Sequence, residues 1–307
     1  MKLITVDGTT VQAIEGEAIR CVLPWKADVG ECPVWHPQEH RLYWIDIQNR
    51  QVHRFDPLTA LNETFDLPEI VTCIQIRESG GLVCTLKKQF ASFKPEGEVL
   101  ERLASIEEDL PGNRFNDGKC DPQGRFWAGT MDAKQWKSPS GHLFRLDAEH
   151  DVRTMRSDVV CANGSGWSPD GRTMYHTESF RYTVYAYDFE PETGNISGRR
   201  TYASVDADGG GFPDGMCVDA EGFVWSNIVG LGQIRRYDPS GRLERVVQMP
   251  VPRATDCTFG GDGLTTLFIT SARETMSAGQ LKTAPFSGSL FALDCDIAGL
   301  PANSFAG

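Results

Sequence analysis

The chain has 307 residues, of which 40% are hydrophobic and 23% are charged, so its composition is that of an ordinary globular protein. Its formal net charge of −12 would repel polyphosphate, and we therefore expect no nucleic-acid partner. Nine cysteines without a CxxC pair argue against a zinc ribbon or a compact disulfide framework and favour reduced thiols. The N-terminus carries acids where a signal peptide needs an apolar core, and no apolar run is long enough to span a bilayer. We therefore predict a cytoplasmic protein with no membrane association.

Short strands rich in aromatic and β-branched residues follow one another along the chain, and helix signals are nearly absent. Turn clusters such as DPxxG, PSG and PETG separate these strands, several of which form hairpin-like pairs. In chain order, the predicted strands are residues 41–47, 51–56, 125–131, 142–147, 173–178, 183–189, 223–228, 233–238, 266–272 and 289–294.

A turn followed by a strand recurs at intervals of about 40–50 residues, the period of a β-propeller blade. We therefore predict an all-β fold, a six-bladed β-propeller that forms a single domain over residues 1–307. The stretch before Glu31 would be an outer strand that closes the ring with the C-terminal blade. A β-sandwich is the alternative, but it would not produce so even a spacing. The six turns begin at His36, Arg77, Asp121, Ser168, Asp219 and Gly260.

The residue five positions before each turn carries a side-chain oxygen in all six repeats: Glu31, Thr72, Asn116, Asn163, Asp214 and Thr255. The innermost strands of a propeller line its channel, so these residues would form a ring around the axis. A hydrated pore lining is the alternative, but glycine or proline beside the four acid and amide residues favours a functional centre. Carboxylate and amide oxygens suit calcium, magnesium or manganese, and zinc also accepts oxygen ligands. The ring therefore predicts a metal site in the central channel, with Asp214, in the motif FPDGM, as the candidate general base.

From GECPVWHPQEHRLYWIDI, through NRFNDGKCDPQGRFWAGTM, ANGSGWSPDGRTMYHTES and FPDGMCVDAEGFVW, to ATDCTFGG and ITSAR, the chain resembles the gluconolactonase and regucalcin (senescence marker protein) family of propellers. The resemblance implies one divalent metal ion bound by Glu31, Asn163 and Asp214. It also implies that Arg114 and Asn116 contact the substrate and that Asp214 doubles as proton acceptor. The chain departs from many relatives after Asn163, where Ser165 replaces a larger apolar residue, which leaves the sugar open.

The predicted function is therefore metal-dependent hydrolysis of a sugar-derived aldonolactone to the aldonic acid. An organophosphate or aryl-ester hydrolase on the same propeller is one alternative, and a non-catalytic calcium-binding propeller is another. The wholly oxygen-bearing ring, with Arg114 beside it, favours a polar sugar lactone as the partner molecule. The longest insertion, residues 272–288, could form a lid over one mouth of the channel. The lactone, the metal and the oligomeric state stay open.

Overall fold

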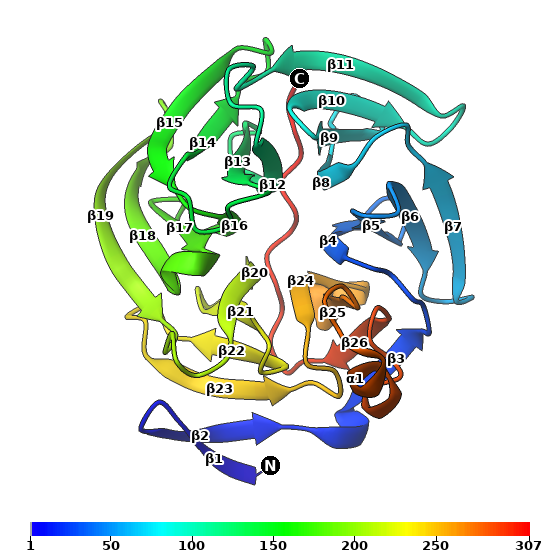
Figure 1. The fold of residues 1–307 in the computed structure, drawn as a ribbon, viewed down its shortest axis with the longest axis vertical. Coiled ribbons are helices and arrows are strands. Elements are labelled where there is room, and N and C mark those ends of the chain that lie inside the picture. Colours follow the sequence, from blue (N-terminus) through cyan, green and yellow to red (C-terminus); the bar gives the residue numbers. More distant parts are fainter. Residues whose placement is uncertain (1) are drawn as a thin grey trace.

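Six β-sheets surround a central channel in the computed structural model of the chain, which describes residues 2–307 (Figure 1). Each sheet begins with a strand at the channel and continues outward, so the sheets are the blades of a propeller. The predicted all-β, six-bladed architecture is confirmed. Within the described residues the single α-helix is α1 (Ala278–Thr283), and no helix there is both long and apolar enough to cross a membrane.

The first three blades each consist of four strands that are consecutive in the sequence. Blade 1 contains β4 (Gly30–His36), β5 (Arg41–Asp46), β6 (Gln51–Asp56) and β7 (Leu61–Asp66). Blade 2 contains β8 (Val71–Ile76), β9 (Leu82–Leu86), β10 (Gln89–Lys94) and β11 (Val99–Ser105). Blade 3 contains β12 (Asn113–Cys120), β13 (Phe126–Asp132), β14 (Gly141–Leu146) and β15 (Val152–Val159).

Blade 4 also consists of four consecutive strands, whereas blades 5 and 6 each include strands from the N-terminal part of the described chain. Blade 4 contains β16 (Ala162–Trp167), β17 (Thr173–Glu178), β18 (Thr183–Glu190) and β19 (Asn195–Ser204). Blade 5 contains β20 (Phe212–Val218), β21 (Val224–Val229), β22 (Gln233–Tyr237) and β23 (Leu243–Gln248), extended by β2 (Thr9–Ile14) and β1 (Lys2–Val6). Blade 6 contains β24 (Ala254–Gly260), β25 (Thr266–Ser271), β26 (Leu290–Asp294) and β3 (Ile19–Leu23). Three 3₁₀ turns complete the secondary structure: Gly16–Ala18, Ser179–Arg181 and Asp262–Leu264.

The ring is closed by β3, which pairs antiparallel with β26 as the outer strand of blade 6. Arg20 on β3 also forms an ion pair with Asp294 on β26, with 2.8 Å between nitrogen and oxygen. The hairpin of β1 and β2 is an addition that the strand pattern did not predict, and β2 pairs parallel with the outer strand β23. The β1–β2 hairpin and strand β3 are visible in the lower part of Figure 1.

The six inner strands contact one another in the order β4, β8, β12, β16, β20, β24 and back to β4. In a ring of six, strands three places apart face each other across the channel. Blade 1 therefore faces blade 4, and blade 3 faces blade 6, as Figure 1 shows.

In blades 3 and 5, buried aspartates explain the spacing between the turn and the strand that follows it. Asp121 and Asp219 are fully buried, and each accepts a hydrogen bond from a tryptophan indole on the following strand. The distances to Nε1 of Trp127 and Trp225 are both 2.9 Å. The turn is thus joined to the core between blades, which requires the aspartate and the tryptophan to stay six residues apart.

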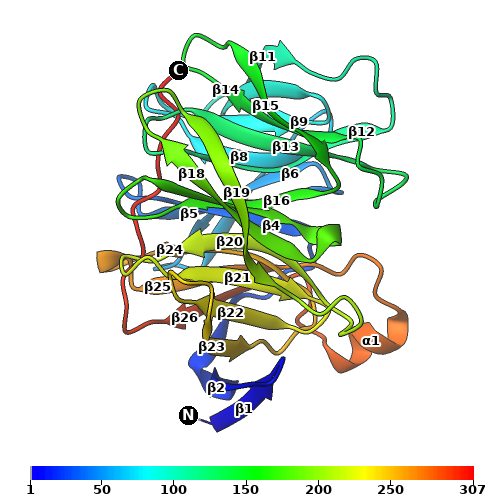
Figure 2. The same cartoon turned by 90° about the vertical axis from the view of Figure 1, so that its left-hand side faces the viewer.

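The C-terminal segment crosses one end of the channel (Figure 1, red). It forms isolated bridges from Gly299 to Asp219 and from Phe305 to Arg77, and the Phe305 side chain is fully buried. Figure 2 shows this segment and α1 on opposite faces of the propeller. One mouth of the channel is therefore covered, and α1 belongs to the other.

Candidate functional site

A β-bulge interrupts each of the six inner strands where it pairs with the second strand of its blade. A bulge leaves a residue without a partner and turns its side chain out of the regular alternation. The six oxygen-bearing positions found in the sequence lie within or at the edge of these bulges and are therefore structurally equivalent. The interrupted stretches are 31–34, 71–73, 115–117, 163–165, 213–216 and 254–257.

One cavity, at the N-terminal ends of the inner strands, brings the candidate residues together. Glu31, Arg114, Asn116, Asn163 and Asp214 all line it, and so does Thr255. The exception in the ring is Thr72, whose hydroxyl instead forms a 2.8 Å hydrogen bond with the hydroxyl of Thr85. A second cavity, lined in part by the C-terminal segment, lies at the other ends of the same strands.

Two pairs of candidate side chains are already hydrogen-bonded. Asn163 donates from Nδ2 to Asp214 Oδ1, and also to Ser179 Oγ at 3.1 Å. Arg114 donates to Asn116 Oδ1 at 2.9 Å, while Asn116 Nδ2 donates to the carbonyl of Ala162 at 2.8 Å. The guanidinium and the amide that were predicted to contact the substrate therefore form one oriented unit.

The glycines beside these residues allow neighbouring strands to approach closely. A Cβ on Gly164 would lie 2.7 Å from the carbonyl oxygen of Asp214, and one on Gly215 would lie 2.1 Å from Asp256 Oδ1. Contacts this short are not tolerated, so both positions require glycine. Close approach between blades thus explains these two glycines.

Burial dominates the electrostatics of the site. It raises the pKa of Glu31 well above the usual range, and the negative charges of Asp214, Asp256 and Asp117 raise it further. Burial likewise raises the pKa of Asp214 well above its usual range, with Asp256 and Asp117 adding to the effect. Neither Glu31 nor Asp214 has a basic side chain within 4.0 Å among residues 2–307. Their charges therefore have no direct counter-charge in the described chain.

Asp117 and Asp256 form a second acidic pair that the sequence analysis missed. Asp117 directly follows Asn116, and Asp256 directly follows Thr255. A search of the position four residues before each turn, instead of five, would therefore have found both. Burial raises the pKa of Asp256 to about 7, although Lys119 acts against this. Burial alone would lower the pKa of Lys119, but Asp256 and Asp117 raise it overall. Lys119 thus offsets one of the two negative charges of this second pair.

The residues at the ring fit a hard divalent cation. Glu31 and Asp214 supply two uncompensated carboxylates, and a half-turn of the Asn163 amide would present its oxygen to them. Three oxygens facing one another are favourable only with a cation between them. Glu31, Asn163 and Asp214 come from blades 1, 4 and 5, so such an ion would connect three blades.

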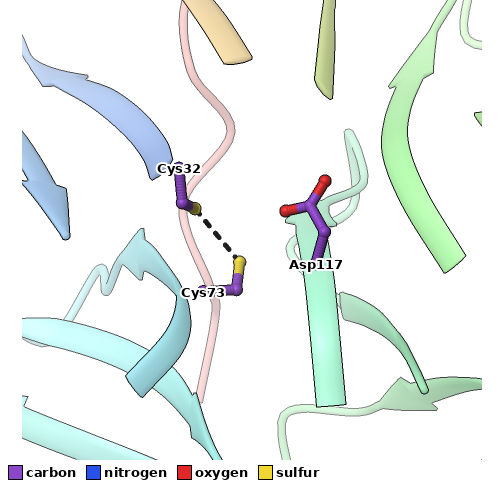
Figure 3. A group of neighbouring side chains, drawn as sticks. All are labelled: Cys32, Cys73 and Asp117. Atoms are coloured by element: carbon purple, nitrogen blue, oxygen red, sulfur yellow. Dashed lines mark hydrogen bonds between the residues drawn. The ribbon is translucent and has the colours of Figure 1, made fainter. Parts of the chain in front are cut away.

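A different cluster lies in the channel beside the ring, made of Cys32, Cys73 and Asp117 (Figure 3). One ligand atom from each lies within 4.8 Å of the other two, and the two sulfurs are 3.2 Å apart. Burial raises the pKa of the Cys73 thiol well above its usual value, and this thiol donates to the carbonyl of Gly118 at 2.8 Å. Cys32 also donates to the carbonyl of Ile74 at 3.2 Å, so both thiols belong to the hydrogen-bonded core of the channel.

The mouth of the cavity contains charged residues that the sequence analysis did not select. Arg253 and Glu274 line it, and Glu274 accepts a 2.6 Å hydrogen bond from Gln48. Glu274 belongs to the long insertion, whose start is held by backbone hydrogen bonds from residues 273 and 274 to Asp28. The insertion, residues 272–288, therefore begins at this mouth of the channel.

A family model described as "SMP-30/Gluconolactonase/LRE-like region" matches residues 29–273. The chain is 38% identical over 95% of its length to a protein from Pseudomonas putida named 6-deoxy-6-sulfogluconolactonase, covering 99% of that protein. It is 34% identical to human regucalcin, over 94% of this chain and 98% of the relative. A solved structure, described as the calcium-binding protein regucalcin from Agrobacterium tumefaciens, superposes with a TM-score of 0.89 at 25% identity, covering 96% of this chain and 98% of that one. The chain therefore belongs to the SMP-30/gluconolactonase/LRE-like family.

Proposed function

We propose that the protein is a divalent-metal-dependent lactonase that opens a sugar-derived aldonolactone to the aldonic acid. The observation that carries this proposal is the convergence of Glu31, Asn163 and Asp214 in one open cavity with no direct basic partner for the two acids. The name of the Pseudomonas putida relative, 6-deoxy-6-sulfogluconolactonase, supports a sugar lactone as the substrate class.

Glu31, Asn163 and Asp214 would hold the metal ion. When bound, a divalent ion polarises a carbonyl oxygen and acidifies a coordinated water. Calcium, magnesium, manganese and zinc are all compatible with the oxygen donors, and the calcium-binding relative from Agrobacterium tumefaciens supports testing calcium first.

Arg114 and Asn116 would orient the lactone. Burial lowers the pKa of the Arg114 guanidinium, which nevertheless stays cationic and keeps several N–H groups for substrate oxygens. Asn116 donates to the carbonyl of Ala162 and to Cys161 Sγ and accepts one hydrogen bond from Arg114, so its amide oxygen retains a further lone pair. The pair can therefore bind hydroxyl or carbonyl oxygens without losing its own orientation.

Asp214 would accept the proton of the attacking water and return it to the ring oxygen as the ester bond breaks. The water oxygen becomes part of the carboxylic acid, and the former ring oxygen becomes a hydroxyl, so the step consumes one water and nothing else. Asp214 lines the cavity together with Arg114 and Asn116, which supports this role.

Acid release from a panel of hexono- and pentonolactones, with chelator and then single divalent metals added, tests the proposal. We expect turnover that disappears with chelator and returns with at least one metal. Aryl esters and a phosphofluoridate serve as comparison substrates. Hydrolysis of these without hydrolysis of any lactone would replace the proposal with the ester-hydrolase alternative, and metal binding without any turnover would favour a binding protein.

We also propose a cytoplasmic location and a single folding unit formed by the six blades. All nine cysteines are free thiols, which supports a reducing compartment.

A further inference from the structure

We propose that Arg253 is a second substrate-binding residue, which takes an acidic group on the lactone at the end away from Arg114. The acidic group would be a sulfonate, carboxylate or phosphate carried by the sugar. This inference rests on the proposed lactonase function and narrows its substrate class to acidic sugar lactones.

Arg253 is the structural counterpart of Arg114. Each lies two residues before a ring position, Arg114 before Asn116 and Arg253 before Thr255. The two arginines are the only charged residues at this position in the six blades. The other four blades have Val29, Ile70, Cys161 and Phe212 there.

The two arginines come from blades that face each other across the channel. Arg114 belongs to β12 of blade 3, and Arg253 directly precedes β24 of blade 6, which faces blade 3 across the channel (Figure 1). Both line the same cavity. A lactone held by Arg114 at one end therefore has the guanidinium of Arg253 available at the other.

The Arg253 side chain has no partner among residues 2–307. It forms no side-chain hydrogen bond and no ion pair within 4.0 Å there, and its Nε is buried without an acceptor. Arg114, by contrast, already donates to the carbonyl of Phe115 and to Asn116. A buried donor left unpaired costs free energy, which a bound anion would recover.

The charge balance of the cavity also favours a singly charged anion. The lining contains the carboxylates of Glu31, Asp214 and Glu274, and the guanidiniums of Arg114 and Arg253. Among these five lining groups, a bound divalent ion would therefore leave an excess of one positive charge. A neutral lactone leaves that charge unbalanced, whereas an acidic lactone neutralises it.

The rival role for Arg253 is electrostatic, because its positive charge also acts on Asp214. In that case its removal would change the hydrolysis of every lactone to a similar extent, mainly through kcat. An anion-binding role instead predicts a KM effect that is confined to acidic lactones.

The test compares gluconolactone with gluconolactones that carry a sulfonate, carboxylate or phosphate at the far end. For Arg253→Gln we expect kcat/KM on the acidic lactones to fall about tenfold or more, chiefly through KM, and to change far less on gluconolactone.

Arg253→Lys should restore part of the loss in kcat/KM on the acidic lactones. Arg273→Gln, a neighbouring arginine outside the cavity, is the matched control and should leave the preference unchanged. Equal losses on both kinds of lactone, or an unchanged preference in Arg253→Gln, would overturn the inference while leaving lactone hydrolysis intact.

Calorimetric binding gives a readout that does not depend on turnover. Gluconate is compared with glucarate, which has an additional terminal carboxylate, using the metal-loaded protein. We expect Arg253→Gln to weaken the binding of glucarate about tenfold and that of gluconate much less. The same weakening for both ligands, or none for glucarate, would contradict the inference even if no lactone were hydrolysed.

Discussion

Glu31 and Asp214 differ from the buried carboxylates Asp121 and Asp219 in lacking a basic partner within 4.0 Å. Asp121 and Asp219 are also buried, but Arg125 and Arg236 lie 2.6 and 2.8 Å from them. Buried charges are normally paired in this way, because desolvation of an isolated carboxylate is costly. Glu31 and Asp214 are buried without such a pairing, and this distinguishes a candidate ligand site from a structural ion pair.

Replacing Glu31 or Asp214 by its amide should abolish metal binding and lower lactone hydrolysis by about 10³-fold, since a bound metal ion supplies several kcal/mol. The folded structure should persist, because each change removes a repulsive charge. Metal binding by calorimetry and acid release are the measurements. Glu101→Gln, at an exposed position on β11, is the control. Wild-type activity in both ring variants would disprove the assignment of these ligands.

Gly215→Ala should destabilise the protein by about 1–3 kcal/mol, because the new methyl group would overlap the carboxylate of Asp256. Gly279→Ala is the matched control, since its methyl group meets nothing closer than 3.9 Å and it lies in α1. Urea unfolding of the two variants measures the difference. Equal stabilities would show that the strands can separate at this point without cost.

The candidate ligands were predictable from the sequence, because the bulge repeats at one place in every blade and the turn marks that place. Asp117 and Asp256 were missed, since a single offset selects only one residue of each bulge. Thr72 shows the opposite error. It lies five residues before its turn, as the other ring residues do, but its hydroxyl bonds to Thr85 and does not line the cavity. Spacing places a Cα on the channel, whereas rotamer and hydrogen-bond partners decide whether the side chain reaches the cavity.

At the scale of strands, blade 1 buries a histidine between β5 and β7. His53 stacks on Trp44 with 4.0 Å between the ring centroids, and its Nδ1 lies 3.0 Å from the hydroxyl of Thr64. Burial lowers the pKa of His53 to about 4. The imidazole is therefore neutral in the folded protein over the range in which an unfolded histidine becomes charged.

This histidine should make the protein less stable as the pH falls from about 6.5 to about 4. In that range the unfolded state binds the proton and the folded state does not, so acidification favours unfolding by up to about 3 kcal/mol. His53→Asn should flatten this part of the curve, whereas exposed His40→Asn should not. Urea midpoints across the pH range provide the measurement. Identical pH slopes for wild type and His53→Asn would contradict the prediction.

The insertion between β25 and β26 was seen in the sequence as the longest interruption of a blade, but its helix was not foreseen. Ser277 and Gln280 form a capping box at α1, the sequence signal of a helix start. Hydrophobic periodicity does not reveal α1, because the helix is only six residues long and none of its residues is buried. Local capping, rather than hydrophobic periodicity, defines this element.

For the whole molecule, the proposed metal ion is an internal crosslink. Its ligands come from blades 1, 4 and 5, and without it Glu31 and Asp214 repel each other. Both carboxyls have folded pKa values above their usual ones, so the metal-free protein should lose stability as the pH rises from about 4.5 towards neutrality. A bound divalent ion should reverse this trend.

Chelation at pH 7 should therefore lower the melting temperature by several degrees, and a metal at a hundredfold excess over its Kd should restore about 3 kcal/mol. At pH 4.5 the chelator should have a much smaller effect. Scanning calorimetry with and without chelator at the two pH values measures this. An effect of equal size at both pH values would argue against carboxylate ligands.

The pairing of β3 with β26 also has a consequence for biosynthesis. Residues 19–23 leave the ribosome early, but their partner strand, residues 290–294, is made almost at the end. Through most of translation β3 is thus a strand with a free hydrogen-bonding edge, and the last blade is incomplete. In a crowded polysome the nearest complementary edge can belong to a neighbouring nascent chain. Exchange of β3 between two copies is therefore the expected misassembly of this protein, and it would yield dimers in which every blade is nonetheless complete.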